Sequence, residues 1–146
     1  KVYLVPCNQQ RLRALPQLGT LRIYKNKMST IKDLDGSNNL EIINLSHNQI
    51  RKIENLESLK NLKELNHSHN QISRIPDLRK YSRISTLYIS FNRLSEPSDV
   101  DQLQHIRNIY MNVYGNPFCD ELRKQGKVQD DVRWANELTP LGSRIL

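Results

Sequence analysis

The sequence predicts a solenoid, a stack of short similar units, rather than a single globular core. Residues 40–59 carry apolar residues and one asparagine in an order that recurs 22 residues later, over 62–81. A fixed period of roughly 20–50 residues is typical of repeat architectures. The apolar content of 37% is low for a globular core but suits a stack one unit thick. The length of 146 residues allows one domain of about six such units.

The matching positions of the two copies define the repeat. In order along the unit, Leu40, Ile43, Leu45, Asn48, Ile50, Ile53, Leu56 and Leu59 correspond to Leu62, Leu65, His67, Asn70, Ile72, Ile75, Leu78 and Tyr81. Each unit has an apolar face that it cannot bury alone, so it requires neighbours above and below.

The string LxxLxLxxNxI in both copies resembles the leucine-rich repeat. The following IxxIxxLxxL is similar to the short 22-residue subtype of intracellular, protein phosphatase 1 regulator-like proteins. This resemblance implies an α/β fold: a right-handed solenoid of five to six repeats with a parallel concave β-sheet and an irregular or short-helical convex side. It also implies that Leu40, Ile43 and Leu45 and their equivalents point inward.

The first unit, residues 1–17, is predicted to be degenerate. In it, Val2, Val5, Cys7 and Gln10 take the positions of Leu40, Ile43, Leu45 and Asn48. Terminal units are often atypical because one of their faces meets water. The second unit begins at Leu18. The fifth runs from Ile84, and residues 95–99 are predicted to cap a short convex helix over 100–106.

The sixth unit departs from the pattern and leaves two registers open. Tyr114 stands where the repeat requires asparagine, and Asn116 follows two residues late. In one register, a two-residue bulge lies between Met111 and Asn116. In the other, the strand shifts so that Met111 and Val113 point inward. Ile109 and Met111 fit the inward positions of the first register, and in that register Tyr110 aligns with Tyr88.

The repeat domain is predicted to span residues 1–118, and residues 119–146 a C-terminal cap. The second segment lacks the 22-residue period. Its apolar residues predict a short helical cap over the last open edge of the sheet; these are Val128, Val132, Trp134, Leu138 and Leu141.

One asparagine per unit is predicted to form a structural ladder. Its members are Asn26, Asn48, Asn70, Asn92 and Asn116. Their amides can satisfy backbone groups where the chain leaves each strand. His67 occupies an inward position held by Leu45 and Ile89 in the neighbouring units. A histidine in a core is usually neutral and hydrogen-bonded, and we expect that here.

The residues between the inward-pointing ones are expected to face the concave side and bind a partner. The candidate binding residues are Arg22, Tyr24, Lys25, Asn44, His47, Glu64, Asn66, His69, Thr86, Tyr88, Phe91 and Tyr110. Tyrosine, phenylalanine and arginine are common hot spots of protein interfaces. Phe91 is the sharpest signal, because an apolar ring on a solvated sheet has no role in the fold itself. The alternative is that Phe91 and Tyr88 only pack on each other.

The formal net charge of +7 is concentrated at one end. Residues 1–36 contain seven Lys or Arg and two acidic residues. Such an end can attract an acidic protein or a nucleic acid, although charge bias of this kind is more often a solvated surface.

The sequence predicts neither an enzyme nor a cofactor. It contains no Gly-rich phosphate loop, no GxSxG and no HExxH. His47 and His69 stand one strand apart, but zinc requires three or four ligands and only Glu64 is near. We therefore expect no metal site. The pair offers a pH-sensitive contact, since imidazoles titrate near neutrality.

Cysteine usage favours a reducing compartment, so the expected location is cytoplasmic, nuclear or cytoskeletal. Cys7 and Cys119 are far apart, with no cluster at either end. The sequons at Asn44 and Asn66 fall on the repeat consensus and are read as chance. No run of 18 apolar residues or signal-like segment is present, so the chain as given is expected to be soluble. It begins without methionine, which is compatible with a fragment of a larger protein.

Three functions follow from these observations. The first is a non-catalytic interaction module or scaffold that binds a protein partner on its concave face. The second is an RNA-associated protein that uses the basic residues Arg11, Arg13, Arg22, Lys25, Lys27 and Lys32, with Tyr24 nearby. The third is a secreted recognition receptor, suggested by the two sequons and by a superficial likeness of residues 116–134 to a secreted type of cap. That likeness is weakened by its single cysteine.

Overall fold

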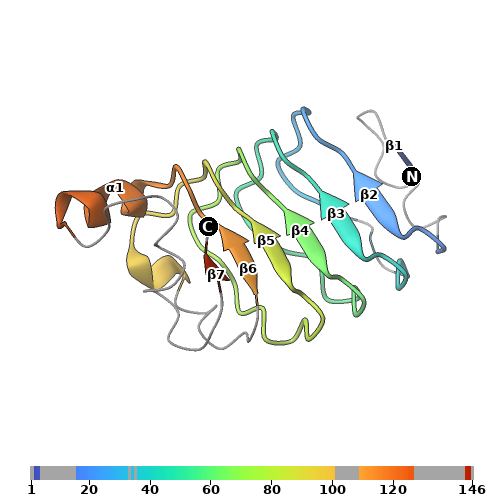
Figure 1. Ribbon diagram of the computed structural model, residues 1–146. Coiled ribbons are helices and arrows are strands. Elements are labelled where there is room, and N and C mark those ends of the chain that lie inside the picture. Colours follow the sequence, from blue (N-terminus) through green and yellow to red (C-terminus); the bar gives the residue numbers. More distant parts are fainter. Residues whose placement is uncertain are drawn as a thin grey trace.

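The computed structural model describes residues 2–3, 16–32, 34, 36–100, 109–126 and 144–145. Within these residues, seven short strands form one parallel sheet in sequence order, each paired with the next (Figure 1). The strands are β1 (Val2–Tyr3), β2 (Thr20–Arg22), β3 (Ile42–Asn44), β4 (Glu64–Asn66), β5 (Thr86–Tyr88), β6 (Tyr110–Asn112) and β7 (Arg144–Ile145). The predicted solenoid with a parallel sheet is confirmed.

The 22-residue period sets the register of the sheet. Leu21 pairs with Ile43, Ile43 with Leu65, and Leu65 with Leu87. In β2 to β6 the middle residue is buried and its two neighbours are half-buried. This alternation is what a strand with one packed face produces. Equivalent side chains of consecutive units therefore stack directly on one another.

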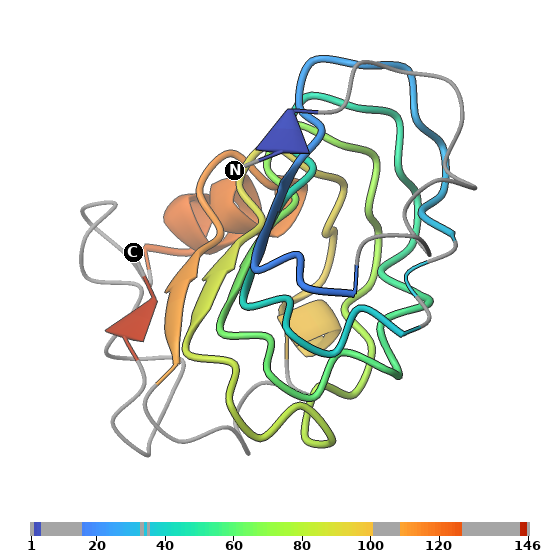
Figure 2. The same cartoon turned by 90° about the vertical axis from the view of Figure 1, so that its right-hand side faces the viewer.

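The core runs along the inside of the coil. Seen along the stack, each turn closes as a loop with its strand on one side and an irregular segment on the other (Figure 2). The inward residues Leu40, Leu62 and Ile84 are at most 4% exposed. On the far side, the described chain is irregular apart from a short 3₁₀ turn at 97–100. The predicted helix over 100–106 lies largely outside the described residues.

Four buried asparagines hold the turns that follow the strands. Asn70 Nδ2 donates to the carbonyls of Leu45 (2.9 Å) and His67 (3.0 Å), and its Oδ1 accepts from the Ile50 N–H (2.9 Å). Asn48, Asn92 and Asn116 likewise each make two bonds to the preceding repeat and donate to the carbonyl three residues earlier in their own repeat. Asn26 is half-buried, and its Nδ2 donates to the Tyr24 carbonyl (3.0 Å).

The first unit has a different register from the predicted one. Val2 pairs with Leu21, so Val2, rather than Val5, takes the position of Ile43. The interval between equivalent positions is thus 19 residues, shorter than in the regular repeats. The other residues assigned to this unit, Val5, Cys7 and Gln10, lie outside the described part of the chain.

The sixth unit adopts the shifted register. Met111 pairs with Leu87, an interval of 24 residues, and Met111 and Val113 are both buried. Tyr110 therefore pairs with Thr86 rather than aligning with Tyr88, and Asn112 takes that place. The alignment of Tyr110 with Tyr88 is wrong, because the unit contains two extra residues before its strand rather than a bulge after it.

A helix and a strand follow the last repeat. Helix α1 (Pro117–Lys124) follows Asn116 and crosses the boundary predicted between 118 and 119. Phe118 and Leu122 are buried in the core. Strand β7 pairs with β6, so a strand covers the sheet edge where the sequence predicted a helical cap. The cap residues from Val128 to Leu141 lie outside the described residues. No helix in the described residues is long and apolar enough to cross a membrane.

Candidate functional site

The outward side chains of the strands form two columns on the solvent side of the sheet, here called the sheet face. One column contains Thr20, Ile42, Glu64, Thr86 and Tyr110, and the other contains Arg22, Asn44, Asn66, Tyr88 and Asn112. All ten are half-buried. The register therefore places seven of the predicted binding residues on one continuous surface.

The asparagines of the sheet face are partly engaged with the backbone. Asn44 Oδ1 accepts from the Ser46 N–H (3.0 Å) and from the Ser46 hydroxyl (2.8 Å). Asn66 Oδ1 accepts from the Ser68 N–H (3.0 Å). These bonds hold the chain as it leaves each strand. The carboxamide oxygens therefore have a structural role that the sequence analysis did not assign to Asn44 and Asn66.

A second set of predicted residues lies in the turns just beyond the strands. Lys25, His47, His69 and Phe91 all have left-handed backbone conformations, with φ between 53° and 56°. Each N–H donates to a carbonyl of the next repeat at 2.8–3.0 Å, which fixes the turn. A positive φ is uncommon for residues other than glycine and is unfavourable for a bulky side chain. Stacking of the repeats maintains it here.

Three rings of these turns form a stack, here called the ring column: His47, His69 and Phe91. The ring centroids of His47 and His69 are 4.1 Å apart, with planes inclined by 11°. Those of His69 and Phe91 are 4.3 Å apart, with planes inclined by 15°. Partial burial, and secondarily the neighbouring His47, lower the pKa of His69. The column therefore resists acquiring positive charge at His69.

The stacked arrangement does not suit a metal site. Nitrogen lone pairs lie in the ring planes, so two nearly parallel imidazoles direct them side by side instead of at one ion. The described residues contain no group of three or more His, Cys, Asp or Glu side chains that could hold a metal.

The ring column ends on a glycine. Gly115 occupies the next turn, with φ of 71°, and Phe91 lies against it. A Cβ at Gly115 would lie 2.6 Å from Phe91 Cδ1. Beside this contact, the Tyr114 ring meets Phe91 edge to face at a centroid distance of 5.3 Å. Arg123 of α1 lies over the Tyr114 ring, with Cζ 5.7 Å from its centroid.

Tyr114 and Arg123 were missed by the sequence analysis. The two-residue shift of the sixth unit moves Tyr114 from the asparagine position into the column of Ser46, Ser68 and Ser90. Anchoring the register on Asn116 and counting backwards would have placed Tyr114 correctly. Arg123 approaches only because α1 folds back beside the last turn, which no repeat pattern predicts.

The aromatic surface continues onto the sheet face. Tyr88 and Tyr110 meet edge to face with centroids 5.8 Å apart. Partial burial raises the pKa of Tyr88, with smaller contributions from Glu64 and Tyr110. Phe91 and Tyr114 are 44% and 42% exposed. The C-terminal half of this side of the solenoid thus presents four rings that remain open to solvent or half-open.

The N-terminal end of the same side is basic. Tyr24 is 44% exposed and Lys25 is exposed beside it. Arg22 is half-buried, and its Nε has no hydrogen-bond partner in the described structure. Lys27 and Lys32 are exposed, while Arg11 and Arg13 lie outside the described residues.

His67 lies in the core, below the ring column. It is 1% exposed, and neither ring nitrogen has a hydrogen-bond partner among the described residues. Burial lowers the pKa of His67 to about 4, so the ring is neutral at pH 7. The expectation of a neutral ring agrees with this value. The expectation of a hydrogen-bonded ring is wrong, because the surrounding inward positions are aliphatic.

Comparison with known proteins identifies the repeats. Residues 38–80 match the family model described as leucine-rich repeats in two copies. The chain contains leucine-rich repeats and has the solenoid fold that they form. The match covers the two regular copies, and the paired strands extend the same architecture to both sides of them.

Solved structures share the fold of this leucine-rich repeat solenoid. An internalin from Listeria monocytogenes is 27% identical, with a TM-score of 0.66 over 72% of this chain and 31% of its own. A leucine-rich repeat protein of Leptospira interrogans is 22% identical, with a TM-score of 0.71 over 99% of this chain and 34% of its own. The chain therefore spans about a third of the length of these two proteins.

The Drosophila melanogaster SNF/U2A′ complex also contains a similar chain. It is 22% identical, with a TM-score of 0.68 over 99% of this chain and 83% of that one. At this identity the likeness concerns the fold alone. No curated protein sequence matches this leucine-rich repeat chain.

Proposed function

We propose that this leucine-rich repeat solenoid is a non-catalytic module that binds a protein partner through the sheet face and the ring column. Leucine-rich repeat proteins are typically protein–protein interaction modules, and the fold supports that class of function. The observation that carries the proposal is the ring cluster at the C-terminal end. Its centre is Phe91, 44% exposed in a strained turn, with Tyr88, Tyr110 and Tyr114 around it.

The cluster has the physical features of an interface hot spot. Aromatic side chains and arginine are enriched in interfaces, and tyrosine and arginine are enriched among the few residues that dominate the binding energy. Arg123 lies over the Tyr114 ring at the margin of the cluster. Packing of the rings on one another accounts for part of the arrangement. It does not remove the exposed faces, whose burial by a partner would be favourable.

Alanine substitution of the cluster tests this proposal. We expect Phe91→Ala and Tyr88→Ala each to weaken partner binding by about 2 kcal/mol, roughly 30-fold in Kd. Partners are captured from a cell extract with the wild-type chain, identified by mass spectrometry, and then titrated with each purified variant. Arg83→Ala, an exposed residue of the turn before β5, is the control and should retain full affinity.

Thermal unfolding of each variant separates binding from folding. A variant that loses partner binding but keeps the wild-type midpoint of thermal unfolding supports the proposal. Recovery of every partner at wild-type affinity by Phe91→Ala and Tyr88→Ala would show that this surface is not the binding surface.

A direct role in RNA binding is the second candidate. It is favoured by exposed Tyr24 beside Arg22 and Lys25. Phosphate binding falls steeply with ionic strength, whereas burial of rings does not. Retention on RNA that disappears between low and physiological salt, and that Lys25→Glu abolishes, would favour this candidate.

We also propose that the module works in a reducing compartment. The support is the wide separation of Cys7 and Cys119 and the interior position of Cys119, whose Sγ lies 3.3 Å from the Val113 carbonyl oxygen. Titration of two thiols in the protein unfolded without a reductant would agree with this, because the buried Cys119 thiol is shielded in the folded chain. Titration of none would favour the secreted alternative.

A further inference from the structure

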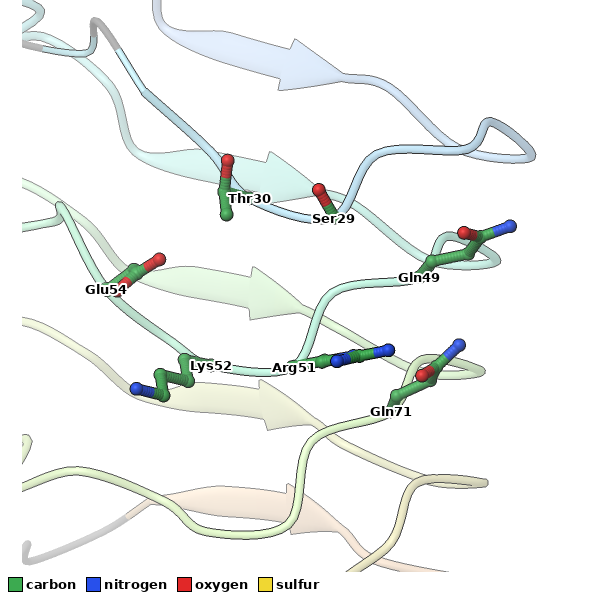
Figure 3. Close-up of a pocket in the computed structure, with 7 residues that line it drawn as sticks. All are labelled: Ser29, Thr30, Gln49, Arg51, Lys52, Glu54 and Gln71. Carbon is green, nitrogen blue, oxygen red and sulfur yellow. The ribbon is translucent and has the colours of Figure 1, made fainter.

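A hollow of about 480 Å³ opens on the side of the solenoid opposite the sheet. It lies between the irregular segments that follow β2, β3 and β4, with the strands behind them in the view of Figure 3. Ser29 and Thr30 line it from the first segment, and the amides of Gln49 and Gln71 line it from the next two. Its size is within the range of ligand-binding clefts.

Positive charge dominates the hollow. Arg51 and Lys52 line it together with a single carboxylate, Glu54. In the described part of the chain neither cation forms an ion pair. Two cations beside one carboxylate leave a net attraction for an anionic group, and Arg51 offers a planar set of donors that matches a carboxylate.

Neighbouring repeats extend the positive surface. Inter-repeat backbone hydrogen bonds place Gln49, Gln71 and Arg93 at equivalent positions, and Lys27 precedes them in the same register. The two glutamines are thus flanked by a cation on either side along the stack. Arg74 stands one repeat beyond Lys52, and it too is exposed. The field around the hollow therefore attracts an extended anion instead of a single ion.

The lining favours a peptide over a nucleic acid. No aromatic ring lines the hollow, so bases have no surface to stack on. Glutamine side chains both donate and accept, as a peptide backbone does, and Glu54 can accept from a backbone N–H. We propose that this hollow binds an extended acidic peptide segment of a protein partner, on a surface separate from the sheet face and the ring column. This second surface does not depend on the function proposed above.

A titration monitored by NMR tests the proposal on the whole chain. The probe is an eight-residue peptide of alternating glutamate and glycine, added to ¹⁵N-labelled protein at physiological salt. We expect the largest amide shift changes at residues 49–54 and 71. The same peptide with glutamine in place of glutamate should bind at least tenfold more weakly.

Two charge-reversed variants separate the hollow from the general positive charge. Arg51→Glu/Lys52→Glu should weaken binding of the acidic peptide at least tenfold. Lys60→Glu/Arg83→Glu changes the net charge by the same amount, in the turns that precede β4 and β5. This control should change the affinity for the acidic peptide less than twofold. Equal losses in both variants, or shift changes centred elsewhere, would overturn the proposal. Stronger binding of an oligouridine RNA at the same residues would overturn its assignment to a peptide.

Discussion

At position 67 the repeat carries an imidazole where its neighbours carry Leu45 and Ile89. Both ring nitrogens are buried without a partner among the described residues, and burial lowers the pKa of His67 to about 4. A buried polar group in this state costs free energy that an aliphatic side chain would not. The chain therefore contains a position that lowers its stability and makes that stability dependent on pH.

We expect the stability to fall as the pH drops from 6.5 to about 4 because of His67. Above pH 6.5 the ring is neutral in both states, whereas between these values only the unfolded state binds the proton. The loss reaches about 3 kcal/mol near pH 4, at roughly 1.4 kcal/mol per pKa unit. His67→Leu should remove most of this dependence and raise the free energy of unfolding at pH 7 by about 1–3 kcal/mol.

Urea unfolding of His67→Leu and the wild type at several pH values provides the measurement. His47→Asn is the control, because its ring is exposed and asparagine tolerates the left-handed turn. A wild-type stability that is constant from pH 7 to pH 4 would contradict this account of His67.

Gly115 supports the site because the Phe91 ring lies directly against it. We expect Gly115→Ala to lower the free energy of unfolding by about 2–4 kcal/mol, because it combines a positive φ with a Cβ in the place of the Phe91 ring. Gly36→Ala is a matched control, with φ of 84° and nothing within 4 Å of the added Cβ, and should cost only about 1 kcal/mol.

The difference between these two glycine variants measures the contact with Phe91. If Phe91→Ala is combined with Gly115→Ala, the extra cost should disappear, since the ring is no longer there to displace. Equal destabilisation by the two alanine substitutions in the wild-type background would show that Phe91 does not lie against Gly115 in solution.

Among the elements, the turn that follows each strand couples the fold to the site. In the regular repeats the strand positions, the asparagine ladder and the inward residues could be read from the sequence, because there each obeys the 22-residue period. The sequence predicts that His47, His69 and Phe91 occupy equivalent positions in successive repeats. It does not predict that their rings stack face to face. The geometry of this stack depends on left-handed backbone in three successive turns and on hydrogen bonds from each turn to the next repeat.

We expect Asn70→Ala to lower the free energy of unfolding by about 1–3 kcal/mol. The substitution leaves the buried N–H of Ile50 without its side-chain acceptor and removes one of two asparagine donors from each of the carbonyls of Leu45 and His67. Asn61→Ala is the control, because its single hydrogen bond, to the Asn38 carbonyl at 2.7 Å, is exposed, and the loss should be below about 1 kcal/mol. Chemical denaturation followed by circular dichroism compares the two variants. Equal losses in the free energy of unfolding would show that the asparagine ladder does not stabilise the fold more than an exposed hydrogen bond does.

For the whole molecule, stacking between neighbours replaces a central core. Each repeat contacts the repeat before it and the repeat after it, so stability is approximately a sum of unit and interface terms. Removing one complete unit should therefore preserve the architecture, whereas removing part of a unit should place apolar residues on the wrong side of the chain.

We expect deletion of residues 52–73 to give a folded protein. The deletion joins Arg51 to Arg74, which takes the repeat position of Lys52, and removes 22 of the 146 residues. The denaturant m-value should fall by about 15%, in proportion to the surface exposed on unfolding. Deletion of residues 52–62 removes half a unit and is the control that should not fold cooperatively. Loss of cooperative unfolding in the 22-residue deletion would contradict a nearest-neighbour stack.

The sequence by itself determined the solenoid, its period, its inward residues and the columns of the regular repeats. These properties follow from local periodicity, which the chain states twice in succession at residues 40–81. The tertiary structure alone decided the register of both end units, the position of Tyr114 beside Phe91, the approach of Arg123 and the hollow lined by Arg51 and Lys52. The physical reason is that these features arise where the period is interrupted or where side chains of different repeats meet, and both depend on packing across the stack rather than on neighbours in the chain.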